Sequence, residues 1–426
     1  MKDSLKQRTT TNASNPNAEI RTNTQLWEAA IEYYADEYYD TEAMTKIYRR
    51  INPRITYQDI ADVISAVYAD TYWTEIQMDP SILSKSMVQA LGLSPAQADL
   101  YARNSMKQWR GSLSRNNLAD TGQVPSQGAY SQSIDIVCNQ NTQLEPDQLI
   151  NNWNNEFWKK PTVGKNYIYV RVQNKAFKGD LTAKAQMFFT QGGFNHPPSS
   201  WIQCLTIKDG SQEGEILLSD NKPGVLNTGD RGASEGFYFT PNGTGHVCII
   251  AAVNDQYFTL NTPLSLSDSN WNSTTWLTHN GAAVWHNVNP QTTTVTSLKV
   301  YNQDGTNEKF VLNAQCRNVP VGSKVKIETN DKKFNSGEIV INKSSQYLET
   351  EAELPGYYDG DLNITIEGPN GELLAKNAAI EFTLMWKLNK GHDYYSRAAI
   401  TFDKSVHLLN DQAILTSLGS YTISGE

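Results

Sequence analysis

One pentapeptide of this chain, at 232–236, has the spacing of a serine nucleophile. Ser234 stands where the G-x-S-x-G pattern of serine hydrolases places that nucleophile. The chemistry needs a strand before the serine and a helix after it, so that the hydroxyl projects from a sharp turn. The aromatic residues at 237–239 indicate a strand instead of a helix. We therefore predict a loop that enters a strand, and no catalytic residue.

The histidines are too dispersed along the chain to predict a metal centre, because there is no H-E-x-x-H motif and no close pair. The acidic run at 359–363 is similar to the start of a calcium loop, but Asn370 stands where an EF-hand carries its bidentate glutamate. The run at 268–272 is a weaker candidate of the same kind. We predict no metal and no cofactor. The histidines are His196, His246, His279, His286, His392 and His407.

The cysteines are too few and too scattered for a disulfide framework or a zinc knuckle. They are Cys138, Cys204, Cys248 and Cys316. Cys204 and Cys248 lie in apolar runs, where a free cysteine acts as a small core residue. We predict that both are free, and a disulfide between them is the alternative.

Aromatic residues are the strongest candidates for a binding site. The chain has 10 tryptophans and 21 tyrosines, many of them in polar, loop-like surroundings. Exposed tryptophan and tyrosine offer flat apolar area for a protein partner or a sugar face. The alternative is packing in the core or between domains. The candidate binding residues are Trp271, Trp276, Trp153, Trp158, Tyr357 and Tyr358.

The N-terminal part of the chain has the periodicity of short helices. Residues 1–22 are polar and aperiodic, so we predict a disordered or docking arm. From 24 to 113 apolar residues recur at helical spacing, with a capping box at Ser94 and Gln97 and a glycine stop at Gly92. We predict a bundle of five short helices over 23–115. Its predicted core is Trp27, Ile31, Ile60, Ile64, Val67, Met87, Leu91 and Trp109.

The middle of the chain has the alternation of half-buried strands. A Ser-, Asn- and Gly-rich segment at 116–132 is the predicted linker, and a long polar loop is predicted at 261–280. Between 133 and 290, residues of opposite character alternate along several short runs. The predicted strands are 133–138, 166–173, 183–189, 201–207, 215–218, 236–240, 246–253 and 283–288.

On these runs, above all 133–137, 166–174, 245–251 and 280–288, the middle region resembles bacterial Ig- or fibronectin-like β-sandwich modules. The resemblance implies an antiparallel sandwich. It implies little about function, because such modules serve as spacers, docking platforms and glycan binders. No catalytic residue is carried over from it.

A second set of strand-like runs occupies 291–426, with hairpin turn signals at Asp304-Gly305 and Asn370-Gly371. The predicted strands are 297–302, 309–314, 324–328, 338–341, 362–367, 380–386 and 397–402. We predict a second β-sandwich, separable from the first near 289–295. The predicted fold class is multidomain α+β, a short-helix bundle followed by two antiparallel Ig-like sandwiches.

Composition excludes several classes of protein. The net charge of −9 argues against a nucleic-acid partner, which needs clustered basic residues. No apolar run approaches the ~18–20 residues of a transmembrane helix, and the first 25 residues lack a signal-peptide core. We expect synthesis in the cytoplasm, with retention there, leaderless release or incorporation into a particle.

Three functions follow as hypotheses. The first is a non-enzymatic structural or adaptor protein of a bacterial or phage-like assembly, with protein partners, either in a homo-oligomer or in a larger particle. The second is a leaderless secreted effector or toxin component whose sandwiches bind a receptor. The third is a glycan-binding module protein. The first fits best, because no catalytic constellation stands out in the sequence.

Overall fold

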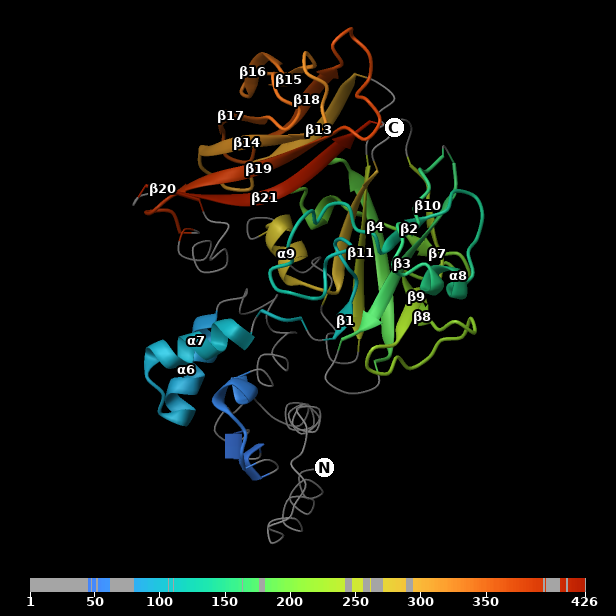
Figure 1. Cartoon of the computed structure of the whole chain (residues 1–426), viewed down its shortest axis with the longest axis vertical. Helices are drawn as coiled ribbons and strands as arrows, with labels where there is room; N and C mark the ends of the chain where they lie inside the picture. The colour runs from blue at the N-terminus through green and yellow to red at the C-terminus, as the bar shows by residue number, and fades with distance from the viewer. Residues whose placement is uncertain are drawn as a thin grey trace.

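The computed structural model describes residues 45–46, 48–50, 53–61, 80–105, 107–109, 111–162, 164–175, 181–241, 247–255, 261, 271–288, 294–393, 395, 407–410 and 413–425. This part of the chain is mostly antiparallel β-sheet, in two regions, with few and short helices (Figure 1). Within it, no helix has the length and apolar character needed to cross a membrane. The sheet-rich prediction is confirmed, whereas the Ig-like topology stays a prediction.

Two of the predicted N-terminal helices are present where the sequence places them. They are α6 (Pro80–Leu91) and α7 (Pro95–Ser105), which pack against each other. Gly92 ends α6 with a φ of 66°, and its N–H donates to the carbonyl of Val88 over 3.0 Å. Ser94 and Gln97 form the predicted reciprocal cap before α7. The predicted arm and much of the predicted bundle lie outside the described residues, so the bundle as a whole stays a prediction.

The predicted bundle extends too far toward the C-terminus. Trp109 follows the end of α7, and its indole N–H donates to the Ser112 carbonyl over 2.9 Å. The next residues form β1 (Ser112–Leu113), which pairs with β3 (Asn166–Asn174). Trp109 is therefore buried in the first β region instead of in a helical core. The spacing of apolar residues did not show whether Trp109 belongs to a helical core or to the β region.

The first β region is one curled, eleven-stranded sheet in the order β12-β11-β4-β8-β9-β3-β10-β7, with β1 and β2 paired to β3 and β6 paired to β4. Strand β11, next to the edge strand β12, is buried at every residue except Asn254 and pairs with both β4 and β12. The further elements are β2 (Ile136–Cys138), α8 (Pro146–Asn151), β4 (Ala183–Gln191), η2 (Pro198–Ser200), β6 (Ile202–Gln203), β7 (Leu205–Thr206), β8 (Glu213–Leu217), β9 (Arg231–Ser234), β10 (Phe237–Phe239), β11 (Val247–Asp255) and β12 (Ala283–Val288).

The segment 116–132, predicted as a linker, is integrated into this region. Asn116 is buried, and its side-chain amide donates to the Leu277 carbonyl over 2.8 Å. Asp120 accepts from the backbone N–H groups of Asn116 and Gly122. The small polar residues of 116–132 make specific hydrogen bonds, so the segment is not a solvated spacer. Composition alone does not reveal this difference.

The predicted loop at 261–280 contains a helix that the sequence analysis missed. It is α9 (Ser273–His279), capped by Asn272, whose side-chain oxygen accepts from the Thr275 N–H over 2.9 Å. The helix lies between the two β regions (Figure 1) and packs against β12 and β21 (Ala413–Ser424). Its Ser- and Thr-rich sequence has weak helix propensity, so this packing holds it.

The second β region consists of two five-stranded sheets. One has the order β16-β15-β18-β13-β5 and the other β17-β14-β19-β21-β20. Strands alternate buried and half-exposed residues, and their buried faces share one apolar cluster, so the sheets face each other as in a sandwich. The elements are β5 (Gly193–Phe194), β13 (Val295–Tyr301), β14 (Glu308–Arg317), β15 (Lys324–Thr329), β16 (Asn335–Val340), β17 (Tyr347–Leu354), β18 (Asp359–Glu367), β19 (Ala379–Asn389) and β20 (His407–Asn410).

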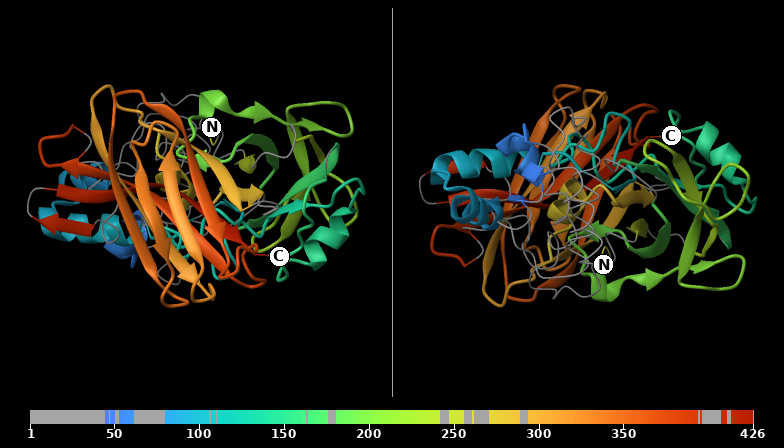
Figure 2. Two further views of the ribbon diagram at one scale, coloured as in Figure 1. Left: turned by 90° about the horizontal axis from the view of Figure 1, so that it is seen from above. Right: turned by 90° about the horizontal axis from the view of Figure 1, so that it is seen from below.

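The two β regions are joined more closely than predicted. Strand β5 comes from the first region but pairs in parallel with β13 of the second. The hydroxyls of Ser131 and Ser420 lie 3.0 Å apart, and Ser273 donates to the Leu418 carbonyl. Seen from above and below, the second region overlies part of the first (Figure 2). Residues 289–293 lie outside the described residues, so the separable boundary near 289–295 stays a prediction, against which this strand pairing argues.

Candidate functional site

Trp271 and Trp276, two predicted surface residues, lie in the core. They are 1% and 2% exposed, and with Trp201 and Trp285 they form a cluster that we call the tryptophan seam. The ring of Trp201 contacts the other three at centroid distances of 5.4, 5.7 and 5.7 Å, and Trp271 and Trp276 are 5.6 Å apart. The prediction that they lie on an exposed loop is wrong. Their polar neighbours in sequence are used for capping and for contacts between the regions.

Trp153 is buried as well, beneath arginine side chains. The Arg115 guanidinium lies 3.9 Å from its ring centroid, and that of Arg231 lies 5.1 Å away. Asp135 pairs with Arg115 over 2.9 Å and with Arg171 over 3.0 Å. Burial lowers the pKa of Arg171, and the Asp135 carboxylate opposes this effect. The prediction of an exposed Trp153 is wrong, because the ring packs within this buried ion network.

Trp158 is half-buried and stacks on His286, with ring centroids 3.9 Å apart. The Nδ1–H of His286 donates to the Ser133 carbonyl over 2.7 Å. Burial lowers the pKa of His286 to about 4, so the imidazole is neutral in the folded protein near neutral pH. Trp158 thus packs within the first β region and does not join it to α6 or α7.

Ser234 and the cysteines, the nucleophiles considered in the sequence, are enclosed. Ser234 lies in β9, is buried, and its Oγ accepts from the Val170 N–H over 3.0 Å. The predicted loop is wrong, because Ser234 ends strand β9, but strand β10 follows it as predicted, so there is no strand–turn–helix elbow here. Cys204 and Cys248 are free and buried, and burial raises both pKa values to about 12. These groups serve the core.

Tyr357 is the predicted site residue that lies on the surface. It is 69% exposed and has a φ of 54°, in the left-handed region that non-glycine residues rarely adopt. Its N–H donates to the Asp304 carbonyl over 2.8 Å, which fixes it against the turn between β13 and β14. That turn approaches so closely that a Cβ on Gly356 would lie 2.2 Å from the Gly305 carbonyl oxygen. The exposed ring therefore sits on a rigid double turn.

Tyr358, the neighbouring candidate, is turned the other way and is half-buried. Its hydroxyl donates to Asp331 Oδ1 over 3.1 Å. Burial, together with this carboxylate, raises the pKa of Tyr358 to about 12. Its role in the structure is to tie the turn at 355–358 to the loop after β15.

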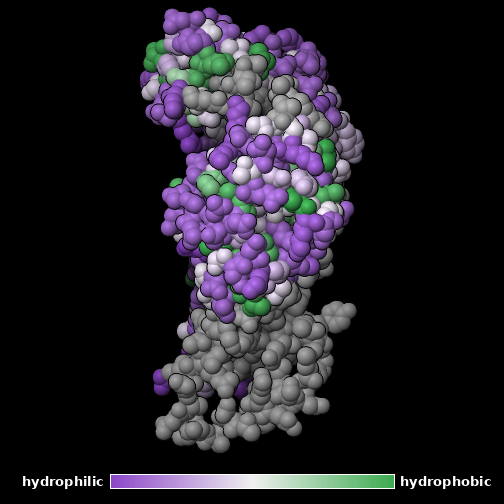
Figure 3. All heavy atoms as spheres, turned by 90° about the vertical axis from the view of Figure 1, so that its right-hand side faces the viewer, coloured by the Kyte–Doolittle hydropathy of each residue, from purple (hydrophilic) through white to green (hydrophobic). Residues whose placement is uncertain are grey.

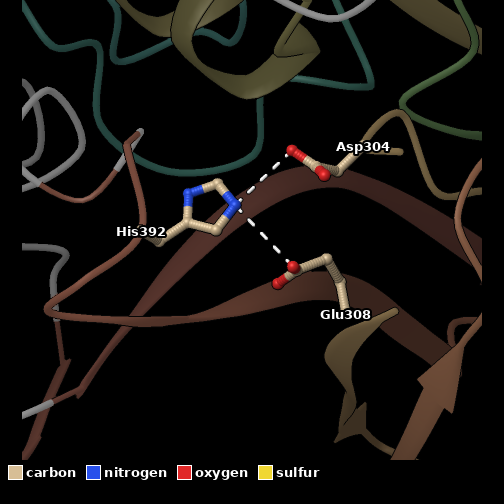
Figure 4. Close-up of side chains that lie close together, drawn as sticks. All are labelled: Asp304, Glu308 and His392. Atoms are coloured by element: carbon tan, nitrogen blue, oxygen red, sulfur yellow. Dashed lines mark ion pairs between the residues drawn. The ribbon is translucent and has the colours of Figure 1, made fainter. Parts of the chain in front are cut away.

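The same double turn carries a cluster that the sequence analysis missed. Asp304 lies in the turn after β13, Glu308 begins β14, and His392 follows β19 (Figure 4). Nε2 of His392 is 3.5 Å from Asp304 Oδ2 and 3.7 Å from Glu308 Oε1. All three side chains are partly buried, and one ligand atom of each lies within 4.8 Å of the others. Among the described residues, this is the group of His, Cys, Asp and Glu side chains whose geometry could accommodate a metal ion.

Hydrogen bonds orient both carboxylates toward His392. The indole N–H of Trp386 donates to Glu308 Oε2 over 2.9 Å. The backbone N–H and the hydroxyl of Thr306 each lie 2.9 Å from Asp304 Oδ1. Partial burial alone would raise the pKa of Asp304, but the Thr306 hydrogen bonds and nearby His392 outweigh it, so that pKa is lowered.

Comparisons with known proteins give no family. No family model and no curated protein matches this chain. Among solved structures, the secreted serine protease VesC of Vibrio cholerae aligns at 12% identity, 59% of this chain and 49% of that chain, with a TM-score of 0.16. This chain thus spans about half the length of VesC.

Two adhesins are also similar. A mutant of CfaE, the CFA/I adhesin of enterotoxigenic E. coli, aligns at 9% identity over 74% of this chain and 93% of that chain, with a TM-score of 0.16. The CupB6 tip adhesin of Pseudomonas aeruginosa aligns at 11% identity over 60% and 93%, with a TM-score of 0.12. At such TM-scores these likenesses carry no argument about fold or function.

Proposed function

We propose that this chain is a non-enzymatic binding protein of a larger bacterial or phage-like assembly. Its contact surface in this proposal is the exposed double turn formed by 304–306 and 356–357, which we call the Tyr357 turn surface. The observation that carries the proposal is the exposed ring of Tyr357, held in a left-handed backbone conformation.

The backbone conformation of Tyr357 supports a role for its exposed ring in binding. A non-glycine residue at positive φ costs about 1 kcal/mol or more, and such strain persists where the surrounding structure imposes it. Here the Asp304 hydrogen bond and the Gly305–Gly356 contact impose it. The result is a large, mostly exposed aromatic side chain whose ring lies over Gly305 of the facing turn. A pre-organised aromatic anchor loses little entropy on binding, which is a property of interface hot spots.

The rest of the molecule supports a scaffold role. Strand β5 and helix α9 join the two β regions, so that the Tyr357 turn surface is fixed relative to the remainder of the β-rich body. On the face drawn in Figure 3, apolar side chains are scattered in small groups among hydrophilic ones. Such a surface would bind a partner through a few anchoring residues and not through one broad apolar patch.

A glycan is the second candidate partner. The ring of Tyr357 is flanked by the turn that carries Asp304 and Thr306, with Glu308 and His392 beside it. An aromatic face with adjacent hydrogen-bonding groups can bind a sugar ring. A protein partner remains the first candidate, because tyrosine is enriched among the hot-spot residues of protein interfaces.

The test replaces the ring without imposing new backbone strain. Asparagine tolerates positive φ, so Tyr357→Asn should fold normally while the aromatic surface is lost. Tyr347→Thr is the matched control, because Tyr347 is 54% exposed but lies in the regular edge strand β17. Full-length protein is used to capture partners from its source organism and is applied to a glycan array. Affinity for the identified partner is then measured by surface plasmon resonance.

We expect Tyr357→Asn to weaken that affinity by about 10-fold or more, and Tyr347→Thr to leave it within about twofold. Equal affinity of the wild type and Tyr357→Asn would contradict the proposed surface. Hydrolytic turnover of the captured partner or of a glycan by the wild type would contradict the non-enzymatic part of the proposal.

A further inference from the structure

We propose that Asp304, Glu308 and His392 bind a divalent transition-metal ion of the zinc class. The three ligand atoms are Asp304 Oδ2, Glu308 Oε1 and His392 Nε2, which face one another in Figure 4. The proposal goes beyond the proposed function, and its test uses no binding partner.

The two separations from His392 Nε2 match the edge of a coordination tetrahedron, and the third, between the carboxylates, is below 4.8 Å. Zinc bonds to nitrogen and oxygen are about 2.0–2.2 Å long, so two ligands at a tetrahedral angle lie about 3.4 Å apart. His392 Nε2 lies 3.5 Å from Asp304 Oδ2 and 3.7 Å from Glu308 Oε1. A charge-assisted N–H···O bond would be about 2.7–2.9 Å long. The imidazole is therefore set back from both carboxylates by the distance that a shared cation needs.

Each carboxylate has one oxygen engaged and one directed at this shared point. Glu308 Oε2 accepts from the Trp386 indole, and Asp304 Oδ1 accepts from the Thr306 backbone N–H. The single proton of the Thr306 hydroxyl can serve either Asp304 Oδ1 or Glu308 Oε1, which lie 2.9 and 2.7 Å away. With Glu308 Oε1 on a metal, the hydroxyl would donate to Asp304. Such outer hydrogen bonds orient metal ligands in proteins.

The ligand chemistry selects the ion. One imidazole nitrogen with two carboxylate oxygens suits zinc and neighbouring transition metals, whereas calcium takes six to eight oxygen ligands. Three protein ligands leave a fourth position for water, and the partial exposure of the side chains gives solvent access to it. The ion would connect the β13–β14 turn to the segment after β19, directly beside the backbone that holds Tyr357.

The experiment uses untagged full-length protein, stripped of metal with a chelator and dialysed. Isothermal titration calorimetry with Zn²⁺, Ca²⁺ and Mg²⁺ is combined with thermal unfolding at each ion. We expect Zn²⁺ to bind at one site and to raise the Tm by a few degrees at saturating concentration, because the ion binds the folded state only. Ca²⁺ and Mg²⁺ should do neither. Substituted Co²⁺ should show the visible absorption of a four-coordinate ion.

Three variants assign the site. His392→Gln and Glu308→Gln should weaken Zn²⁺ binding by about 100-fold or more, and Thr306→Val by about 10-fold, because it removes only an orienting hydroxyl. His196→Gln is the control, since it removes a histidine near η2 and should leave Zn²⁺ affinity unchanged.

The glutamine variants keep side chains of similar size, and circular dichroism confirms that each variant folds. If one variant fails to fold, the other and Thr306→Val still decide the result. Absence of Zn²⁺ binding by the wild type would overturn the proposal in favour of a plain ion pair. Zn²⁺ binding that persists in all three variants, or equal binding of Ca²⁺, would overturn it too.

Discussion

The tryptophan seam and the Tyr357 turn surface look alike in sequence and differ in the structure. Both contain large aromatic residues between small polar ones, but Trp271 is 1% exposed and Tyr357 is 69% exposed. Around Trp271 the polar residues bind backbone groups of other segments, as when Asn195 donates to the Trp271 carbonyl. Around Tyr357 they close a tight double turn. Polar neighbours in the sequence therefore do not by themselves show whether an aromatic residue lies on the surface.

The largest expected effect is in the tryptophan seam. Trp271→Ala should lower the free energy of unfolding by about 3–5 kcal/mol, because it removes a buried indole and leaves a cavity beside three other tryptophans. Urea unfolding followed by circular dichroism measures this. A loss below about 1 kcal/mol would show that Trp271 is not part of the core.

The second prediction concerns pH and His286. Its pKa is about 4 when folded and about 6.5 when unfolded, so between these values the unfolded chain binds a proton that the folded chain does not. Stability is therefore complete above pH 6.5 and falls by up to about 3 kcal/mol as the pH drops toward 4. In His286→Gln the decline between pH 6.5 and 5, before most carboxylates titrate, should largely disappear. An unchanged decline would mean that His286 is protonated in the fold.

A smaller loss is expected at Ser234. Its hydroxyl oxygen accepts from the buried Val170 N–H, so Ser234→Ala should cost about 1–3 kcal/mol by leaving that donor unpaired. Differential scanning calorimetry should show a lower Tm. A wild-type Tm would contradict the structural role, and loss of a hydrolytic activity at an unchanged Tm would point to a nucleophile.

The smallest expected effect has the opposite sign. Tyr357→Asn should leave stability unchanged or raise it by up to about 1 kcal/mol, because asparagine adopts positive φ more readily. Chemical denaturation measures the difference from Tyr347→Thr, which has no such strain to lose. A loss above about 1 kcal/mol would show that the Tyr357 ring supports the fold.

Features fixed by local interactions were predictable from the sequence. The glycine stop at Gly92 and the cap at Ser94 depend on residues within one helical turn, and both are present. Most strands with apolar alternation were also placed correctly. Strand β17 was missed, because its alternating glutamates do not look apolar, and it is held by pairing with β14.

Features fixed by distant contacts were not predictable. Helix α9 depends on packing between two β regions, and strand β5 belongs to a sheet formed by residues far along the chain. The metal-site candidate joins Asp304 and Glu308 to His392 across the strands β14 to β19, so spacing gave no signal. A turn at Asp304-Gly305 was predicted, but the hairpin was wrong, because this turn connects β13 and β14 of different sheets. The partner of the Asp304 carboxylate gave no signal in the sequence.

The most direct test of the account is hydrogen–deuterium exchange with and without the captured partner. The account predicts new protection of backbone amides in 302–308 and 355–358, and unchanged exchange in 271–279, which is already buried. Protection at 271–279 with none at the Tyr357 turn surface would contradict the central claim that the tryptophans hold the fold while Tyr357 makes the contact.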